Sequence, residues 1–239
     1  MALEAEISTR HLSYVETGRA QPSREMVLRL AERLSVPLRE RNALLVAAGF
    51  APMYQARPLD HPDLAAARQA VELVLKGHEP NPALAVDRHW NLVAANAVVP
   101  LLLDGVAPWL LEPPVNVLRL SLHPEGLGPR LANSAQWRAH LLHRLQQQIA
   151  ATADSELQAL HDEIAAYPFA EDKDSPPPSP IAVPFELHTH LGTLSFISTI
   201  TIFGTPVDVT LQELAVESFF PANAETQQAL QRLQARRRA

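Results

Sequence analysis

In the segment Thr193-Leu-Ser-Phe-Ile-Ser-Thr-Ile-Thr-Ile-Phe203, polar and apolar side chains largely alternate. Successive side chains of a β-strand point to opposite faces, so this pattern predicts a half-buried strand over residues 193–203. The apolar parity holds Leu194, Phe196, Ile200 and Ile202. Ser198 has the same parity, which makes it a candidate polar point in a pocket.

Other segments extend the predicted sheet. After a turn at residues 204–206, the segment 211–220 alternates again, with Glu213 and Glu217 on its polar side, and this predicts a second strand. Earlier in the chain, residues 83–87 and 90–95 are short apolar runs separated by two polar residues. That arrangement is typical of a β-hairpin.

Helices are predicted on both sides of these strands. Residues 63–76 and 134–151 carry apolar side chains at helical spacing, and residues 155–166 and the end of the chain predict two more helices. The apolar positions are Leu64, Ala67, Val71 and Val74 in the first helix and Trp137, Leu141, Leu145 and Ile149 in the second. Residues 174–180 contain four prolines and predict a loop.

The first fifty residues predict three short helices. Ser8 is placed to cap the first helix and Gly18 to end it, whereas Ser23 is placed to cap the second. Pro37 begins the third helix, and residues 50–62 form a proline-containing linker.

The predicted fold class is therefore α+β, with two domains. An all-α head occupies residues 1–57, and an antiparallel sheet with flanking helices occupies residues 58–239.

Composition excludes several classes of protein. The net charge of -6 excludes a strongly basic surface, so any contact with DNA has to be local. The absence of cysteine excludes a disulfide framework, thiolate metal sites and a cysteine nucleophile. No apolar run reaches the roughly 18 residues of a membrane helix, and the N-terminus is not a signal peptide. We expect a cytoplasmic protein without a membrane partner.

The segment from Ala5 to Ser23, Ala-Glu-Ile-Ser-Thr-Arg-His-Leu-Ser-Tyr-Val-Glu-Thr-Gly-Arg-Ala-Gln-Pro-Ser, resembles the recognition helix and following turn of the XRE family of helix-turn-helix regulators. The resemblance implies binding to operator DNA. The residues it assigns to DNA contact are Thr9, Arg10, His11, Ser13, Tyr14, Arg19 and Ser23. Arg10 suits guanine, and Arg19 with the helix capped by Ser23 suits phosphate.

Members of the XRE family carry a further helix upstream of this segment. The head is therefore expected to be partial, with its first helix missing. Val27, Leu30 and Leu45 would then be partly exposed, and DNA binding by this chain would be weak.

Residues 58–235 resemble the MmyB-like ligand-binding domain that follows an XRE head in many bacterial regulators. The segments that carry the resemblance are 82–97 (PALAVDRHWNLVAANA), 116–126 (NVLRLSLHPEG), 137–142 (WRAHLL) and 203–221 (FGTPVDVTLQELAVESFFP). It implies a PAS-like fold that binds a small apolar or acyl-like molecule between sheet and helices. The candidate ligand contacts are Trp90, Leu92, Asn96, Asn116, Leu194, Phe196, Ser198 and Ile200, and Leu84 or Val86 are further candidates.

Simpler interpretations stay open. Each candidate pocket residue can be ordinary core, and Asn96 can simply cap the helix that follows it. The pairs His140 with His143 and His188 with His190 lack a carboxylate at ligand spacing, so no metal site is predicted.

The sequence therefore predicts a homodimeric transcription regulator with a small-molecule ligand, without catalytic residues or a cofactor. Two alternatives remain. The first is a truncated sensor or interaction module that no longer binds DNA. The second is an acyl-handling enzyme.

Overall fold

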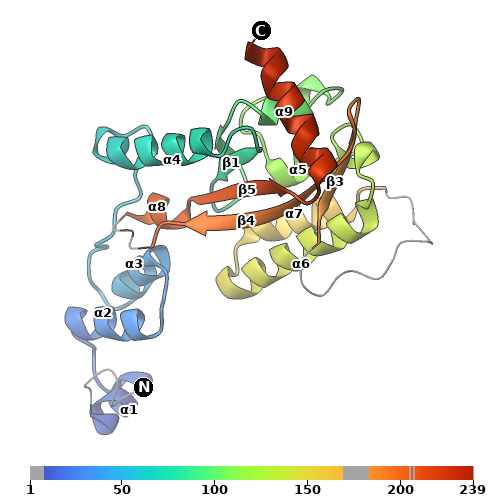
Figure 1. Cartoon of the computed structure of the whole chain (residues 1–239). Coiled ribbons are helices and arrows are strands. Elements are labelled where there is room, and N and C mark those ends of the chain that lie inside the picture. Colours follow the sequence, from blue (N-terminus) through green and yellow to red (C-terminus); the bar gives the residue numbers. More distant parts are fainter. Residues whose placement is uncertain (1–7, 169–182, 205, 207, 239) are drawn as a thin grey trace. The chain divides into compact units, whose positions relative to one another are not determined.

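The computed structural model describes residues 8–168, 183–204, 206 and 208–238 (Figure 1). Contacts within the chain define two units. The N-terminal unit comprises residues 1–66 and 203–213, and the C-terminal unit comprises residues 67–202 and 214–239. The N-terminal unit thus includes the connection between the last two strands of the C-terminal unit. The loop expected at residues 174–180 lies outside the described residues.

The N-terminal unit is helical. Its helices are α1 (Thr9–Glu16), α2 (Arg24–Arg33), α3 (Leu38–Ala47), the 3-10 turn η1 (Pro62–Leu64) and α8 (Val209–Glu213). The predicted breaks are confirmed, because Gly18 has a φ of 68° after α1 and the Ser23 hydroxyl accepts a hydrogen bond from the Met26 amide at the start of α2. The expected exposure of Val27 and Leu45 is wrong. Both are buried where α2 and α3 pack against each other, and Leu30 alone is partly exposed.

Helix α8 is bound to α3 and to the linker. The Gln212 side-chain oxygen accepts a hydrogen bond of 2.6 Å from the Leu38 amide at the start of α3. Glu213 forms a two-pronged ion pair with Arg39, at 2.6 and 2.9 Å. The strand predicted over residues 211–220 therefore begins later, at Ala215, because the preceding residues are helical.

The C-terminal unit is built on a curled five-stranded antiparallel sheet, which confirms the α+β fold class. The strands are β1 (Ala83–Val86), β2 (Leu92–Ala95), β3 (Phe185–Thr189), β4 (Gly192–Ile202) and β5 (Ala215–Pro221). Their order in the sheet is β2-β1-β5-β4-β3. The predicted hairpin corresponds to β1 and β2, and the alternating stretch corresponds to β4.

Helices flank this sheet (Figure 1). They are α4 (Ala65–Gly77), α5 (Val117–Leu122), α6 (Ser134–Thr152), α7 (Ser155–Ala165) and α9 (Ala224–Arg238), with the 3-10 turns η2 (Val99–Leu102), η3 (Pro108–Leu111) and η4 (Gly128–Arg130). Asp154 separates α6 from α7, since its carboxylate accepts hydrogen bonds from the Glu156 and Leu157 amides and so caps α7. The two helices then pack side by side.

The buried faces differ from the predicted ones at two places. In α4 the buried residues are Val71 and Leu75, whereas Val74 is 49% exposed, so the buried stripe is rotated from the expected one. In β4, Ile200 and Ile202 are exposed although they share the parity of the buried Phe196. The alternation therefore predicted the strand correctly. It did not predict that only the first half of the strand is buried.

None of the helices in the described parts of the chain combines the length and apolar character needed to cross a lipid bilayer.

Candidate ligand-binding site

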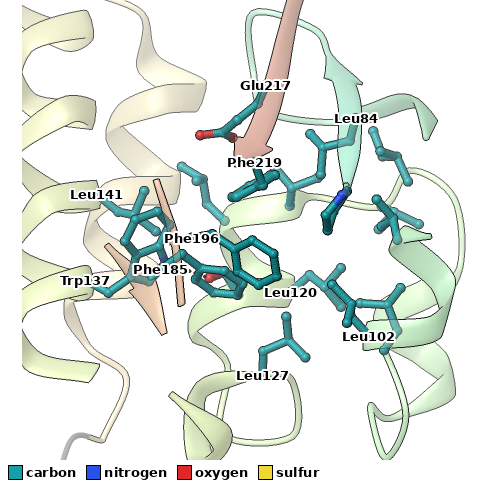
Figure 2. Close-up of a pocket in the computed structure, with 18 of the residues that line it drawn as sticks. Leu84, Leu102, Leu120, Leu127, Trp137, Leu141, Phe185, Phe196, Glu217 and Phe219 are labelled. Carbon is teal, nitrogen blue, oxygen red and sulfur yellow. Dashed lines mark hydrogen bonds between the residues drawn. The ribbon is translucent and has the colours of Figure 1, made fainter. Parts of the chain in front are cut away.

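A cavity of about 200 Å³ lies between the sheet and the helices that cover it (Figure 2). Phe185 and Phe196 lie on the side of the cavity where α6 supplies Trp137. Leu102, from η2, lies on the opposite side. Every side chain that lines it is apolar except those of Ser121 and Glu217.

Strand register explains why the sheet offers an apolar wall. Glu217 of β5 is paired with Leu84 of β1, and residues directly opposite on neighbouring strands point to the same face. Phe219, two residues further along β5, shares that face by the period of two. The three side chains line the cavity together with Leu92 of β2.

The helical wall comes from α5 and α6. Trp137 and Leu141 are one turn apart on α6, so both face the cavity. The indole nitrogen of Trp137 donates a hydrogen bond of 3.0 Å to the hydroxyl of Ser121 on α5. The Trp137 side chain is 4% exposed, and this bond gives its only polar group, the indole N–H, a partner. The bond also holds α5 against α6.

The loop after α5 requires two glycines. A Cβ atom on Gly126 would overlap the carbonyl oxygen of Leu120, and one on Gly128 would lie 2.8 Å from the carbonyl oxygen of Leu122. The backbone therefore passes so close to α5 that only glycine fits. This close approach places Leu127, between the two glycines, in the cavity wall.

The polar edge of the cavity is a partly buried ion pair. The Glu217 carboxylate lies 3.4 Å from the guanidinium of Arg144, and their side chains are 8% and 20% exposed. Burial raises the pKa of Glu217, and this effect outweighs the opposing influence of Arg144 and of a hydrogen bond with Ser198. Burial also lowers the pKa of Arg144.

Trp90 holds Arg144 in place. The guanidinium carbon of Arg144 lies 4.2 Å from the centre of the Trp90 ring, and the ring nitrogen donates to the Gln148 side chain at 2.8 Å. Trp90 has a φ of 67°, a strained value for a non-glycine residue that its surroundings must impose. Trp90 and Ser198, both candidate ligand contacts, are not among the lining residues.

The remaining apolar candidates have different positions. Leu92 and Phe196 line the cavity. Leu194 is buried in the same core but is not a lining residue, and Ile200 is 42% exposed and does not line the cavity. Of the two further candidates on β1, Leu84 lines it.

The two asparagine candidates have structural partners. The Asn96 amide nitrogen donates to the carbonyl oxygens of Leu75 and Asn81, and its oxygen accepts from the Val98 amide. The capping role left open for Asn96 is not observed, because the 3-10 turn η2 that follows it has no side-chain cap hydrogen bond. Asn116 caps α5 by accepting from the Arg119 amide. Neither asparagine lines the cavity.

The candidate DNA contacts lie on or near α1. Arg10 and Ser13 are exposed, and Arg10 donates a hydrogen bond of 3.2 Å to the Tyr14 hydroxyl on the same helix face. Arg19 and Ser23 are also exposed, in the turn before α2 and at its N-cap. The side chains of Thr9 and His11 lie outside the described part of the structure.

Several residues that line the cavity were not predicted from the sequence. Glu217 was assigned to the polar side of a strand, but it is 6% exposed and faces the cavity. Leu118, Leu120 and Ser121 of α5 were not predicted, because a six-residue helix is too short to show a periodic pattern. The sequence did contain one indication for Glu217. It lies two residues before Phe219, so both side chains point to the same face of the strand.

A second cavity, of about 290 Å³, is more polar. Arg130 and His188 are among its lining residues. The Arg130 guanidinium already donates to the carbonyl oxygens of Leu102, Asp104 and His188, so it serves to join loops. In the described residues no group of three or more histidine, aspartate or glutamate side chains is arranged to hold a metal ion.

Comparison with known proteins identifies a family of ligand-binding domains. Residues 67–233 match the family described as the MmyB-like transcription regulator ligand binding domain. No curated protein matches the sequence. Since the family match spans more than half of the chain, the chain belongs to the family of MmyB-like transcription regulator ligand-binding domains.

Proposed function

We propose that this protein is a DNA-binding transcription regulator whose C-terminal domain senses a small apolar, chain-like molecule, such as a fatty-acid-like compound. The observation that carries the proposal is the apolar cavity between sheet and helices in the domain that belongs to the regulator family. In this proposal the cavity binds its ligand and does not convert it.

The size of the cavity supports a short-chain ligand. A cavity of about 200 Å³ offers many times the space that one buried water molecule needs, so it can hold a small organic molecule. Pockets of this kind bind through burial of apolar surface, and their few polar groups fix orientation.

The exposed side chains near α1 support a role in DNA binding. Arg10 and Ser13 lie on the first helix, where a recognition helix would present them to the major groove. Arg19 precedes the N-terminus of α2, and helix N-termini attract phosphate. We further propose that the regulator acts as a homodimer on a two-fold operator.

The continuity of the chain supports coupling between ligand binding in the cavity and the helices of the N-terminal unit. Residues 203–213 belong to the N-terminal unit and are continuous with β4 and β5 of the C-terminal unit. Strand β5 carries Glu217 and Phe219 of the cavity wall and directly follows α8, which binds α3. A ligand that prefers one position of β5 would therefore bias the position of α3.

The experiment is fluorescence anisotropy with a labelled duplex from the region upstream of the protein's own gene. We expect binding that weakens with salt and changes in affinity when 1-heptanol or heptanoate is added. If DNA affinity is unchanged by every probe that binds the cavity, the sensing role is wrong. If no DNA is bound with or without a probe, the DNA-binding role is wrong for this chain.

A further inference from the structure

The one charged side chain that lines the apolar cavity is placed there by the sheet. Glu217 is paired with Leu84 on β1 and with Ile200 on β4, and both Leu84 and Phe219 line the cavity beside it. Its side chain is 8% exposed. A ligand that fills this cavity therefore lies against a carboxylate that has little access to water.

The carboxylate has acceptor capacity beyond its observed partners. An ionised carboxylate offers about four acceptor sites. Arg144 Nη1 lies 3.4 Å from Oε1, which is longer than the roughly 2.7–2.9 Å of a good charge-assisted hydrogen bond. Another donor inside the cavity would be favourable, because a buried acceptor gains from each partner that replaces its lost water.

The charge of Glu217 is nevertheless balanced. Arg144 is held against the Trp90 ring at 4.2 Å, so its positive charge stays beside the carboxylate. The pair is net neutral. A charged group on the ligand would have no counter-ion in the cavity. Its transfer out of water would therefore be unfavourable.

We propose that the ligand presents an uncharged hydrogen-bond donor, of the alcohol or amide class, to Glu217, and that this group determines the specificity of the cavity. The inference rests on the proposed sensing function and names the class of molecule sensed. The donor hydrogen bonds to a carboxylate oxygen while the alkyl chain contacts the leucine and phenylalanine walls. An ionised carboxylate or ammonium group at this position is disfavoured.

Isothermal titration calorimetry of the full chain tests the proposal with four heptyl-sized probes. The probes are 1-heptanol, its isomer hexyl methyl ether, heptanoate and heptylamine. The ether accepts hydrogen bonds but cannot donate one, so it matches the alcohol in size and formula without the donor. We expect 1-heptanol to bind roughly tenfold more tightly than the ether, as one hydrogen bond to a charged group predicts. It should also bind more tightly than either charged probe.

Two variants assign the preference to Glu217. Glu217→Gln keeps the shape and removes the charge, so the advantage of the alcohol over the ether should shrink several-fold. Glu225→Gln makes the same change at an exposed position of α9, outside the cavity, and should leave the advantage unchanged. Loss of the advantage in Glu225→Gln as well, or its full retention in Glu217→Gln, would overturn the assignment.

The wild-type series is decisive even if a variant does not fold. Tightest binding of heptanoate would mean that Arg144 recognises the ligand, and tightest binding of heptylamine would mean that Glu217 is not neutralised. Equal binding of the alcohol and the ether would mean that no donor is recognised. Each of these results overturns the inference while the sensing function stands, whereas the absence of binding by all four probes contradicts both.

Discussion

Arg144 of α6 and Glu217 of β5 form a partly buried ion pair 3.4 Å apart at the edge of an apolar cavity. The pair joins the helical wall of the cavity to its sheet wall. Removing Arg144 would leave the charge of Glu217 buried without compensation, which is strongly unfavourable.

The raised pKa of Glu217 makes stability depend on pH. Because burial raises this pKa above the ordinary value of 4.5, the folded state binds the proton more tightly than the unfolded chain. The stabilising contribution is therefore complete below the unfolded pKa and is lost as pH rises through the folded pKa. The stability of wild type relative to Glu217→Gln should fall over this window, as measured by urea unfolding at a series of pH values.

Glu225→Gln, a change at an exposed position of α9, is the control and should leave the pH profile of wild type unchanged. A stability difference between wild type and Glu217→Gln that stays constant or grows between about pH 5 and about pH 8 would contradict the burial of an ionisable Glu217.

The close approach of the loop after α5 predicts a steric effect. Gly126→Ala should destabilise the protein by roughly 1–3 kcal/mol, because the new Cβ overlaps the Leu120 carbonyl oxygen. Gly77→Ala, at the end of α4, meets no atom within 4 Å and should be close to neutral. Chemical denaturation measures both changes, and equal stability of the two variants would show that the loop can shift freely.

The junction between α8 and the linker predicts a local effect in the N-terminal unit. Asp208 is 1% exposed, lies 3.0 Å from the Arg57 guanidinium and accepts from the Thr210 amide. Asp208→Ala should cost roughly 2–4 kcal/mol of local stability, from the lost ion pair and the lost cap. Hydrogen exchange of the α3 amides should accelerate.

Glu25→Gln is the control for this junction. Glu25 pairs with Arg29 one turn along α2, and its side chain is 81% exposed. Such exposed pairs contribute only about 0.3–0.5 kcal/mol. If Asp208→Ala leaves α3 exchange as slow as Glu25→Gln does, α8 does not stabilise α3.

The outward position of Arg10 predicts a role in operator recognition. In a chain that binds its operator, Arg10→Ala should weaken binding by roughly 1–3 kcal/mol and relax the preference at one base pair. Arg33→Ala, at the exposed end of α2, is the charge-matched control. Binding assays on a set of operator variants should separate the two, and identical behaviour would rule out base contact by Arg10.

Much of the fold could be predicted from local patterns. The alternation in residues 193–203 and the four-residue spacing of Trp137, Leu141 and Leu145 each correspond to an observed element with buried apolar positions. The caps at Gly18 and Ser23 were equally local. Such signals depend on a few neighbouring residues, and so the sequence displays them directly.

The site could be predicted only in part, because it depends on contacts between distant segments. Ile200 has the parity of Phe196 but is exposed, since burial of β4 does not extend to its second half. Glu217 looked like a surface residue because its partner Arg144 is far away in the sequence. Helix α8 is five residues long and was taken for the start of a strand.

The melting temperatures of two phenylalanine variants show whether the cavity holds an apolar ligand. Phe196→Trp enlarges a fully buried side chain of the cavity wall, whereas Phe220→Trp makes the same change at a 44% exposed position outside it. A ligand that binds only the folded state at about a hundred times its Kd stabilises by about 2.7 kcal/mol. We predict that 1-heptanol raises the melting temperature of wild type and Phe220→Trp by several degrees but not that of Phe196→Trp. No effect on wild type, together with strong destabilisation by Phe196→Trp alone, would show that these residues are packed core and would contradict the account.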